Sequence, residues 1–168
     1  MLGFYENFPQ NIHHLETFIF AISNKKIQQK LTQTIQELNK KTYSFEEVGN
    51  PTVPNCTILF EFGIADTGNF TFLNEQEAEK LQNKITKESL RIIDWFCSIR
   101  YYKNTSPKKT PLKFDYYMIR FAFEKNSIQF SVFHERGPRY ISPEELTSLI
   151  VNQTNIKQKK TLLKRNAS

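Results

Sequence analysis

The sequence predicts an α+β fold, with a mostly antiparallel sheet of about five strands and three helices in the order β-α-β-α-β-β-β-α. Aromatic residues are frequent, at 14%, and only 5 glycines occur, a balance typical of well-packed strands. Several segments alternate apolar and polar residues, most of them in the second half of the chain. Three others carry an apolar residue every three or four positions, as surface helices do. We expect these helices to cover one face of the sheet.

The first strand and the first helix lie close to the N-terminus. Residues 15–22 are β-branched and aromatic, a pattern that fits either a strand or the first turns of a helix. We favour a strand, because Ser23 and Asn24 then provide an N-cap for a helix that begins at Lys25. The apolar stripe of this helix consists of Ile27, Leu31, Ile35 and Leu38.

A loop, a strand and a second helix come next. Residues 42–54 contain one glycine and two prolines, so we expect a loop there. Residues 57–65 place an apolar side chain at every second position, which indicates a strand with one core-facing side. Asn74 is the predicted N-cap of the second helix and Glu77 stands at its capping-box position. Its stripe consists of Ala78, Leu81 and Ile85.

Three long strands are predicted in the second half, over residues 90–102, 112–124 and 127–135. If Lys125 and Asn126 form a two-residue turn, the apolar residues of the last two strands face one another, and Tyr116 faces Glu135. A shift by one residue would mix the apolar and polar sets, so this register is favoured.

The last predicted helix has the sharpest start signal in the chain. Ser142 is the N-cap, Pro143 occupies the first helical position and Glu145 completes a capping box. Residues 1–155 are expected to form a single domain. Residues 156–168 are basic and lack an apolar period, so we expect a flexible tail.

Charge is distributed unevenly along the chain. The net charge is +6, and residues 89–168 carry 15 basic and 6 acidic side chains. Such an excess suits an anionic partner such as nucleic acid, an acidic protein surface or a membrane surface, and it also suits an ordinary soluble basic domain. Cys56 and Cys97 stand outside any metal-binding spacing, so we expect buried, reduced thiols.

Neither a leader peptide nor a membrane span is predicted. Residues 1–10 lack a basic segment followed by an apolar one, and no stretch approaches the roughly 18 apolar residues that a membrane span needs. We therefore expect a cytoplasmic protein that does not bind membranes.

The first candidate site is the face of the sheet opposite the helices. Its residues are Phe96, Ser98, Arg100, Tyr102, Tyr116, Met118, Arg120, Gln129, Ser131 and Phe133. Arginines interleaved with aromatic rings on an open sheet can stack bases and meet phosphates. The same residues can instead pack beneath a helix, a loop or a partner subunit.

The second candidate site is the run HERGPRY, residues 134–140, where a strand ends and a turn begins. Arg136 and Arg139 can bind a phosphate or carboxylate in bidentate geometry, and His134 can act as an acid or base. The alternative is a structural cluster in which Glu135 pairs with one arginine and His134 is partly buried.

The remaining candidates carry weaker signals. The polar loop of residues 103–113 contains four lysines, of which Lys108 and Lys109 are adjacent, and it can contact a phosphate backbone or be simply solvated. The neighbouring His13 and His14 point to opposite faces of a strand, so we expect no metal pair. The acidic residues Asp94, Asp115 and Glu61 could gather into a metal site, but nothing in their spacing requires one. We expect no metal and no cofactor, and the familiar catalytic motifs are absent.

Three segments carry a resemblance to known proteins: residues 60–66 (FEFGIAD), 114–120 (FDYYMIR) and 134–140 (HERGPRY). The chain resembles small uncharacterised archaeal proteins of similar length. The resemblance implies a cytoplasmic protein from an AT-rich archaeal genome, and it carries over no activity and no site residues.

The sequence favours a non-catalytic accessory module that binds nucleic acid, RNA rather than DNA, or a nucleoprotein complex. The expected contacts are Arg100, Lys108, Lys109, Arg120, Arg136, Arg139, Tyr102 and Tyr116. One alternative is a protein-protein or homo-oligomeric interaction domain whose partner covers the aromatic face. The other is a small enzyme that acts on an anionic substrate through His134, Glu135 and Arg136.

Overall fold

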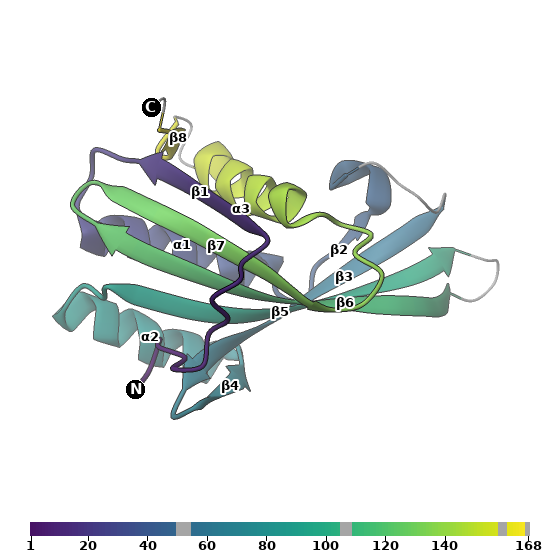
Figure 1. Ribbon diagram of the computed structural model, residues 1–168, viewed down its shortest axis with the longest axis horizontal. Coiled ribbons are helices and arrows are strands. Elements are labelled where there is room, and N and C mark those ends of the chain that lie inside the picture. The colour runs from purple at the N-terminus through teal and green to yellow at the C-terminus, as the bar shows by residue number, and fades with distance from the viewer. Residues whose placement is uncertain (50–54, 105–108, 158–160, 167–168) are drawn as a thin grey trace.

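The computed structural model describes residues 1–49, 55–104, 109–157 and 161–166, without the side chains of residues 109–112. Its elements are β1 (His14–Ile19), α1 (Asn24–Leu38), β2 (Thr42–Ser44), the short 3-10 helix η1 (Phe45–Glu47), β3 (Cys56–Asp66), β4 (Asn69–Phe72), α2 (Glu75–Lys87), β5 (Ile92–Asn104), β6 (Lys109–Glu124), β7 (Ser127–Arg136), α3 (Pro143–Lys157) and β8 (Lys164–Arg165). Figure 1 shows the long strands as one twisted sheet.

The strands form one antiparallel sheet in the order β2-β3-β5-β6-β7-β1-β8, and β4 pairs with β3 beside β2. The predicted α+β class and antiparallel pairing are confirmed. The prediction of about five strands is wrong, because the sheet has eight, and the element order therefore differs too. The additional strands β2, β4 and β8 have only 3, 4 and 2 residues, too few to show a period of two.

Two segments expected to be loops are partly regular. Residues 42–47 form β2 and η1, which pack onto the core through the fully buried Phe45. The predicted polar loop of residues 103–113 is largely strand, because β5 continues to Asn104 and β6 begins at Lys109. Pairing between these two strands draws polar residues into the sheet, because backbone groups form the hydrogen bonds whatever the side chain.

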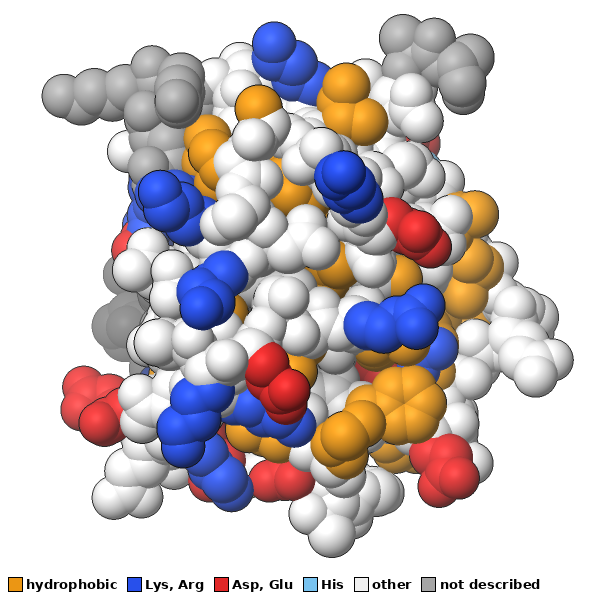
Figure 2. All heavy atoms as spheres, turned by 90° about the vertical axis from the view of Figure 1, so that its left-hand side faces the viewer, with side chains coloured by type: hydrophobic (Ala, Val, Ile, Leu, Met, Phe, Trp, Pro, Cys, Tyr) orange, Lys and Arg blue, Asp and Glu red, His pale blue; other side chains and the backbone are white. Residues whose placement is uncertain are grey.

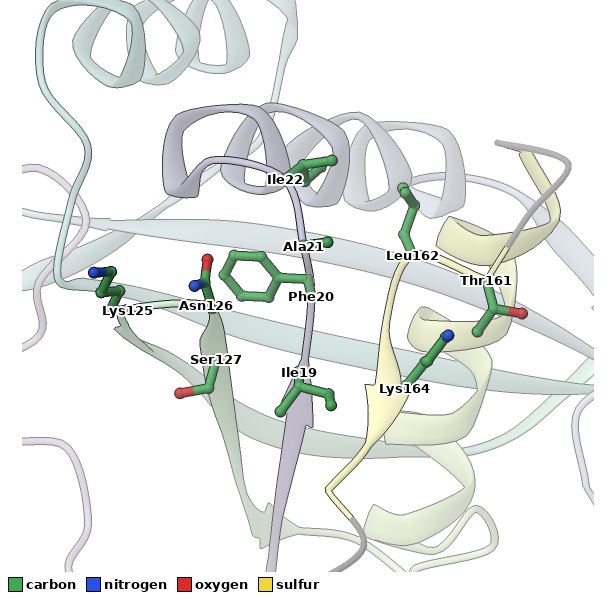
Figure 3. A pocket seen from close by; sticks show the side chains of 10 residues that line it. All are labelled: Ile19, Phe20, Ala21, Ile22, Lys125, Asn126, Ser127, Thr161, Leu162 and Lys164. Carbon is green, nitrogen blue, oxygen red and sulfur yellow. The ribbon is translucent and has the colours of Figure 1, made fainter.

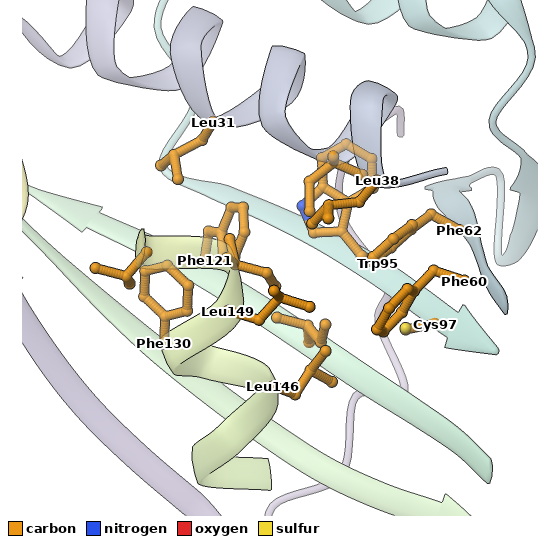
Figure 4. Close-up of a cluster of buried hydrophobic side chains, with 14 of the residues drawn as sticks. Leu31, Leu38, Phe60, Phe62, Trp95, Cys97, Phe121, Phe130, Leu146 and Leu149 are labelled. Carbon is orange, nitrogen blue, oxygen red and sulfur yellow. The ribbon is translucent and has the colours of Figure 1, made fainter. Parts of the chain in front are cut away.

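The three helices cover one face of the sheet, and the hydrophobic core lies between (Figure 4). The predicted stripes of α1 and α2 are fully buried in it. From the sheet side, Phe60, Trp95 and Phe121 fill the space beneath the helices. Each such side chain stabilises the fold by about 1.5–3 kcal/mol. Cys56 and Cys97 are free thiols buried in the same core, as predicted.

The predicted hairpin register is confirmed over most of its length. Asn126 adopts a φ of 60° in the turn, and seven successive pairs match, from Phe123 with Ile128 to Tyr117 with His134. The register then shifts between Tyr116 and Tyr117, so that Tyr116 faces Arg136 and not Glu135. Such a bulge re-aims the side chains beyond it, and here it brings an arginine to the aromatic face.

Residues 1–13 cross the face of the sheet that the helices leave open, and we call them the N-terminal strap. Figure 1 shows the strap running from the chain start, near β4 and α2, across β5 and β6 to β1. Backbone hydrogen bonds fix both ends, from Gly3 N–H to Ala65 and from His13 N–H to Val132. The strap covers one half of the open face and leaves the other half exposed.

The C-terminal segment is not a free tail over residues 161–166. Leu162 and Leu163 are buried, and the side-chain oxygen of Asn155 accepts hydrogen bonds from both of their N–H groups. β8 then pairs with β1. This contact was not predicted, because the segment is mostly basic and two adjacent leucines form too short an apolar pattern to indicate packing against the core. No helix in the described residues is long and apolar enough to cross a membrane.

Candidate functional site

Aromatic rings form a continuous series on the exposed half of the open face. Phe70 of β4 contacts Phe96 of β5 with 5.6 Å between ring centroids, Phe96 contacts Tyr116 of β6 at 5.3 Å, and Tyr116 contacts Phe114 at 4.8 Å. Phe114 is 44% exposed and the other three rings are half-buried. We call these four residues the aromatic series. Tyr5 of the strap contacts Phe70 in a tilted arrangement, with 4.6 Å between ring centroids.

The backbone positions this series through a tight turn and a glycine. Thr67 and Gly68 have φ values of 52° and 76°, and this turn folds β4 back along β3. Gly63 of β3 pairs with Phe72 on one side and Phe96 on the other. A Cβ at Gly63 would lie 3.3 Å from the Thr71 carbonyl oxygen and 3.5 Å from Phe70 Cβ, so β4 packs closely over this glycine. Gly63 and the phenylalanines beside it line a hollow of about 480 Å³ on the aromatic face.

Three cationic side chains lie near the aromatic series: Arg100 lines the hollow, Lys40 lies beside Phe72, and Arg136 stands opposite Tyr116. The Nε of Arg100 lies 3.3 Å from Glu61 Oε1, and the Arg100 side chain is 55% exposed. Lys40 Nζ lies 5.2 Å from the ring centroid of Phe72. The exposed Arg136 stands opposite Tyr116 in the ladder, so it shares that face of the sheet.

Arg120, which was predicted to lie on the same contact surface, is paired with a buried carboxylate and its side chain is only 22% exposed. Its Nε and a terminal nitrogen lie 2.7 and 2.8 Å from the two carboxylate oxygens of Asp94, which has no exposed surface. The rings of Phe4 and Phe8 lie 5.3 and 4.5 Å from the guanidinium carbon. The strap thus covers this arginine, and we leave it out of the contact surface.

The HERGPRY run wraps around the buried carboxylate of Asp115, which the sequence suggested only as a member of an acidic set and not as a partner of this run. Asp115 accepts hydrogen bonds from the backbone N–H groups of Arg139 and Tyr140 at 2.7 and 3.0 Å and from the Tyr101 hydroxyl at 2.5 Å. His134 Nε2 lies 2.8 Å from it. The structural alternative paired Glu135 with an arginine and left His134 partly buried; Glu135 is exposed, and the carboxylate that His134 pairs with is Asp115.

Gly137 is required for this wrap. Its φ is +112°, and a Cβ there would lie 2.4 Å from both Asp115 Oδ1 and the Phe114 carbonyl oxygen. Gly137 is therefore the residue by which the sequence indicates a turn packed tightly against another segment. Its neighbour could not be identified, because Asp115 is more than twenty residues away along the chain.

The aromatic hydroxyls beside Asp115 stay protonated. Burial, with the neighbouring Tyr117 and Asp115, raises the pKa of Tyr101 far above its ordinary value, and burial with Asp115 likewise raises the pKa of Tyr117. Both hydroxyls therefore remain donors, Tyr101 to Asp115 and Tyr117 to the Ile141 carbonyl. Since the His134 side chain is only 11% exposed, this arrangement stabilises the turn and leaves little access for a substrate.

The other predicted residues are dispersed. Arg139 is exposed with a φ of 59°, and Tyr102 is half-buried at the far end of the open face. Lys108 and the side chain of Lys109 lie outside the described residues. His13 Nδ1 accepts a hydrogen bond from the His134 N–H, while His14 pairs with Glu16.

No group of three or more metal-ligating side chains occurs among the residues that the structure describes. The three acidic residues considered together have separate partners: Asp94 pairs with Arg120, Asp115 with His134, and Glu61 with Arg100.

A second hollow, of about 530 Å³, lies at the β1–β8 edge (Figure 3). Phe20, Ile22 and Leu162 line it together with Lys125 and Lys164, and none of the predicted site residues is among its lining. On the side of the molecule in Figure 2, lysines and arginines are scattered between acidic and hydrophobic side chains. The second hollow places the single aromatic ring of Phe20 beside two lysines, whereas the aromatic series brings four rings together beside Arg100.

Comparisons of the chain with protein-family models, with curated proteins and with solved structures find no match.

Proposed function

We propose that this chain is a non-catalytic module that binds single-stranded nucleic acid, RNA rather than DNA, on the exposed half of the open sheet face. The observation that carries the proposal is the aromatic series beside Arg100 and Arg136. Unpaired bases stack on aromatic side chains and on guanidinium planes, and sequence-specific RNA binding mostly uses such unpaired bases. Phosphates of the same strand would meet Arg100, Arg136 and Lys40.

The spacing of the rings supports a single strand over a duplex. The rings come from β4, β5 and β6, with β3 between β4 and β5, and their centroids are 4.8–5.6 Å apart. Such a surface offers ring faces and edges to separated bases, whereas a duplex buries the faces of its bases in its own stack. The binding energy would come from stacking and from phosphate contacts, so no catalytic group is needed.

The test is a fluorescence-anisotropy titration of labelled single-stranded RNA, single-stranded DNA of the same sequence and duplex DNA, at low and at physiological salt. We expect the single-stranded RNA to bind most tightly, and Tyr116→Ala to weaken binding by about 1–3 kcal/mol through lost stacking. Arg136→Ala should weaken it and reduce the salt slope by about 0.7. Lys87→Ala, which removes a charge from α2 on the helical side, is the matched control.

No binding of any nucleic acid at low salt would contradict the proposal. The alternative is then a protein interface, which the exposed Phe72 and Phe114, at 40% and 44%, favour. In that case Phe114→Ala should change the oligomeric state or the elution volume of the protein, and RNA should have no effect on either.

A further inference from the structure

We infer that the hollow beside the aromatic series is a base-specific subsite that selects guanine, with Glu61 and Arg100 as the residues that read its edge. The inference rests on the proposed function and names the base that the surface prefers. Its starting point is that the hollow combines stacking rings with one carboxylate and one guanidinium, and that both charged groups line it.

The hollow has room for a base above β5, between the side chains of Glu61 on β3 and Tyr116 on β6. Glu61, Ser98 and Tyr116 stand opposite one another on β3, β5 and β6. Since neighbouring strands lie about 4.8 Å apart, Glu61 and Tyr116 are separated by roughly 10 Å across the sheet. Ser98 between them is small, and Gly63 beside Phe96 has no side chain. Because the planes of Phe96 and Tyr116 are 50° apart, a base can stack on one of these rings, contact the other and turn its edge toward Glu61.

The free acceptor capacity of Glu61 decides which base fits. A carboxylate accepts hydrogen bonds at two oxygens and donates none. Oε1 of Glu61 lies beside the Arg100 Nε, and Oε2 has no hydrogen bond within the part of the chain that the structure describes. The Glu61 side chain is 26% exposed, so it faces the hollow and is still reachable by a ligand.

Guanine is the base whose groups complement this pair. Its Watson–Crick edge presents two adjacent donors, N1–H and the N2 amine, which match a carboxylate. Its O6 and N7 accept hydrogen bonds, and a guanidinium is the side chain that most often reads them. Adenine and cytosine offer an amine but no second adjacent donor, and uracil offers one N–H between two carbonyls. In addition, the Arg100 charge offsets the repulsion between Glu61 and the phosphates.

The experiment measures base preference within single-stranded RNA. Labelled heptanucleotides of uridine with one central guanosine, inosine, adenosine or uridine are titrated by anisotropy. Inosine differs from guanosine only by the missing 2-amine. We expect the guanosine oligonucleotide to bind about tenfold more tightly than the inosine one, the discrimination typical of a bidentate contact. Glu61→Gln should remove the difference between guanosine and inosine, because an amide presents a donor where the carboxylate had an acceptor.

Glu79→Gln is the matched control, because it removes the same charge from the exposed surface of α2. It should keep the guanosine preference, and a thermal melt of Glu61→Gln close to that of the wild type would show that the fold is intact. Binding of all four oligonucleotides with equal affinity, or a preference that survives Glu61→Gln, would overturn the inference while the proposed function stands. Failure of every oligonucleotide to bind would overturn both.

Discussion

Two carboxylates without exposed surface, Asp94 and Asp115, organise opposite faces of the sheet. On the open face, Asp94 binds Arg120 and accepts the Tyr5 N–H at 2.7 Å, and so links the strap to the sheet. On the helical face, Asp115 contacts His134 and accepts the N–H groups of Arg139 and Tyr140, and so holds the turn after β7 in place. Because burying a charge without a partner is costly, each carboxylate fixes the position of the groups that compensate it. The sequence does not reveal these partners, since they lie far away along the chain.

His13 gives the strap a dependence on pH. Burial lowers the pKa of His13 below its ordinary value, and the positive charge of Arg139 and the neighbouring His134 lower it further. In the folded protein the neutral ring accepts the His134 N–H at Nδ1 and stacks on Phe133. As pH falls through about 6.5, the unfolded chain takes up a proton first. The stabilisation by neutral His13 is therefore fully present above about pH 6.5. It is lost as the pH falls from there through the lower pKa that His13 has in the folded protein.

We expect the free energy of unfolding of the wild type to decrease, relative to His13→Phe, between about pH 7.5 and about pH 5.5. The phenylalanine keeps a ring over Phe133 but cannot titrate. Urea denaturation at each pH measures the difference between the two proteins. A difference that stays constant across this range would show that the protonation of His13 does not act on the fold.

The helices and strands that could be predicted are those with a long periodic pattern of apolar residues or a helix-capping residue. The three helices and the five long strands were predicted from periodicity and capping, and the hairpin register from the consistency of its two faces. The strands β2, β4 and β8 were missed because pairing with a neighbour, and not their own pattern, makes them strands. Of the aromatic series, Phe96 and Tyr116 were predicted to share a face, whereas Phe70 and Phe114 were not among the predicted residues. The strap over Arg120 and the position of Asp115 beneath the HERGPRY turn were not predicted, because both depend on contacts between distant segments.

The capping box of α3 allows a test at this scale. The Glu145 N–H donates to the Ser142 hydroxyl at 3.0 Å and the Ser142 N–H to the Glu145 carboxylate at 2.9 Å. We expect Ser142→Ala to lower the free energy of unfolding by about 1 kcal/mol, measured by urea denaturation. Ser148→Ala in the interior of α3 is the control, since alanine is a better helix former there. Equal stability of the two variants would mean that α3 is held by packing alone.

Across the whole molecule, the two faces of the sheet are closed by different means. The helical face is sealed by a continuous core, and half of the open face is sealed by the strap through one buried ion pair and two phenylalanines. The unsealed half carries the aromatic series. The excess positive charge of the second half of the chain is thus only partly available to a ligand, because Arg120 is used internally while Arg100 and Arg136 are exposed.

The ion pair under the strap is the link whose loss should affect the molecule most widely. Arg120→Met leaves the buried Asp94 without its partner, and we expect it to cost about 3–5 kcal/mol of unfolding free energy. The double variant Asp94→Asn with Arg120→Met removes both charges and should recover part of that loss. Arg100→Met, at an exposed ion pair, should cost less than about 1 kcal/mol. Urea denaturation gives these values, and amide hydrogen exchange at residues 3–8 shows whether the strap has opened. If Arg120→Met were as stable as Arg100→Met while those amides stayed protected, the strap would be held by its apolar contacts and backbone hydrogen bonds, and the ion pair would have no structural role.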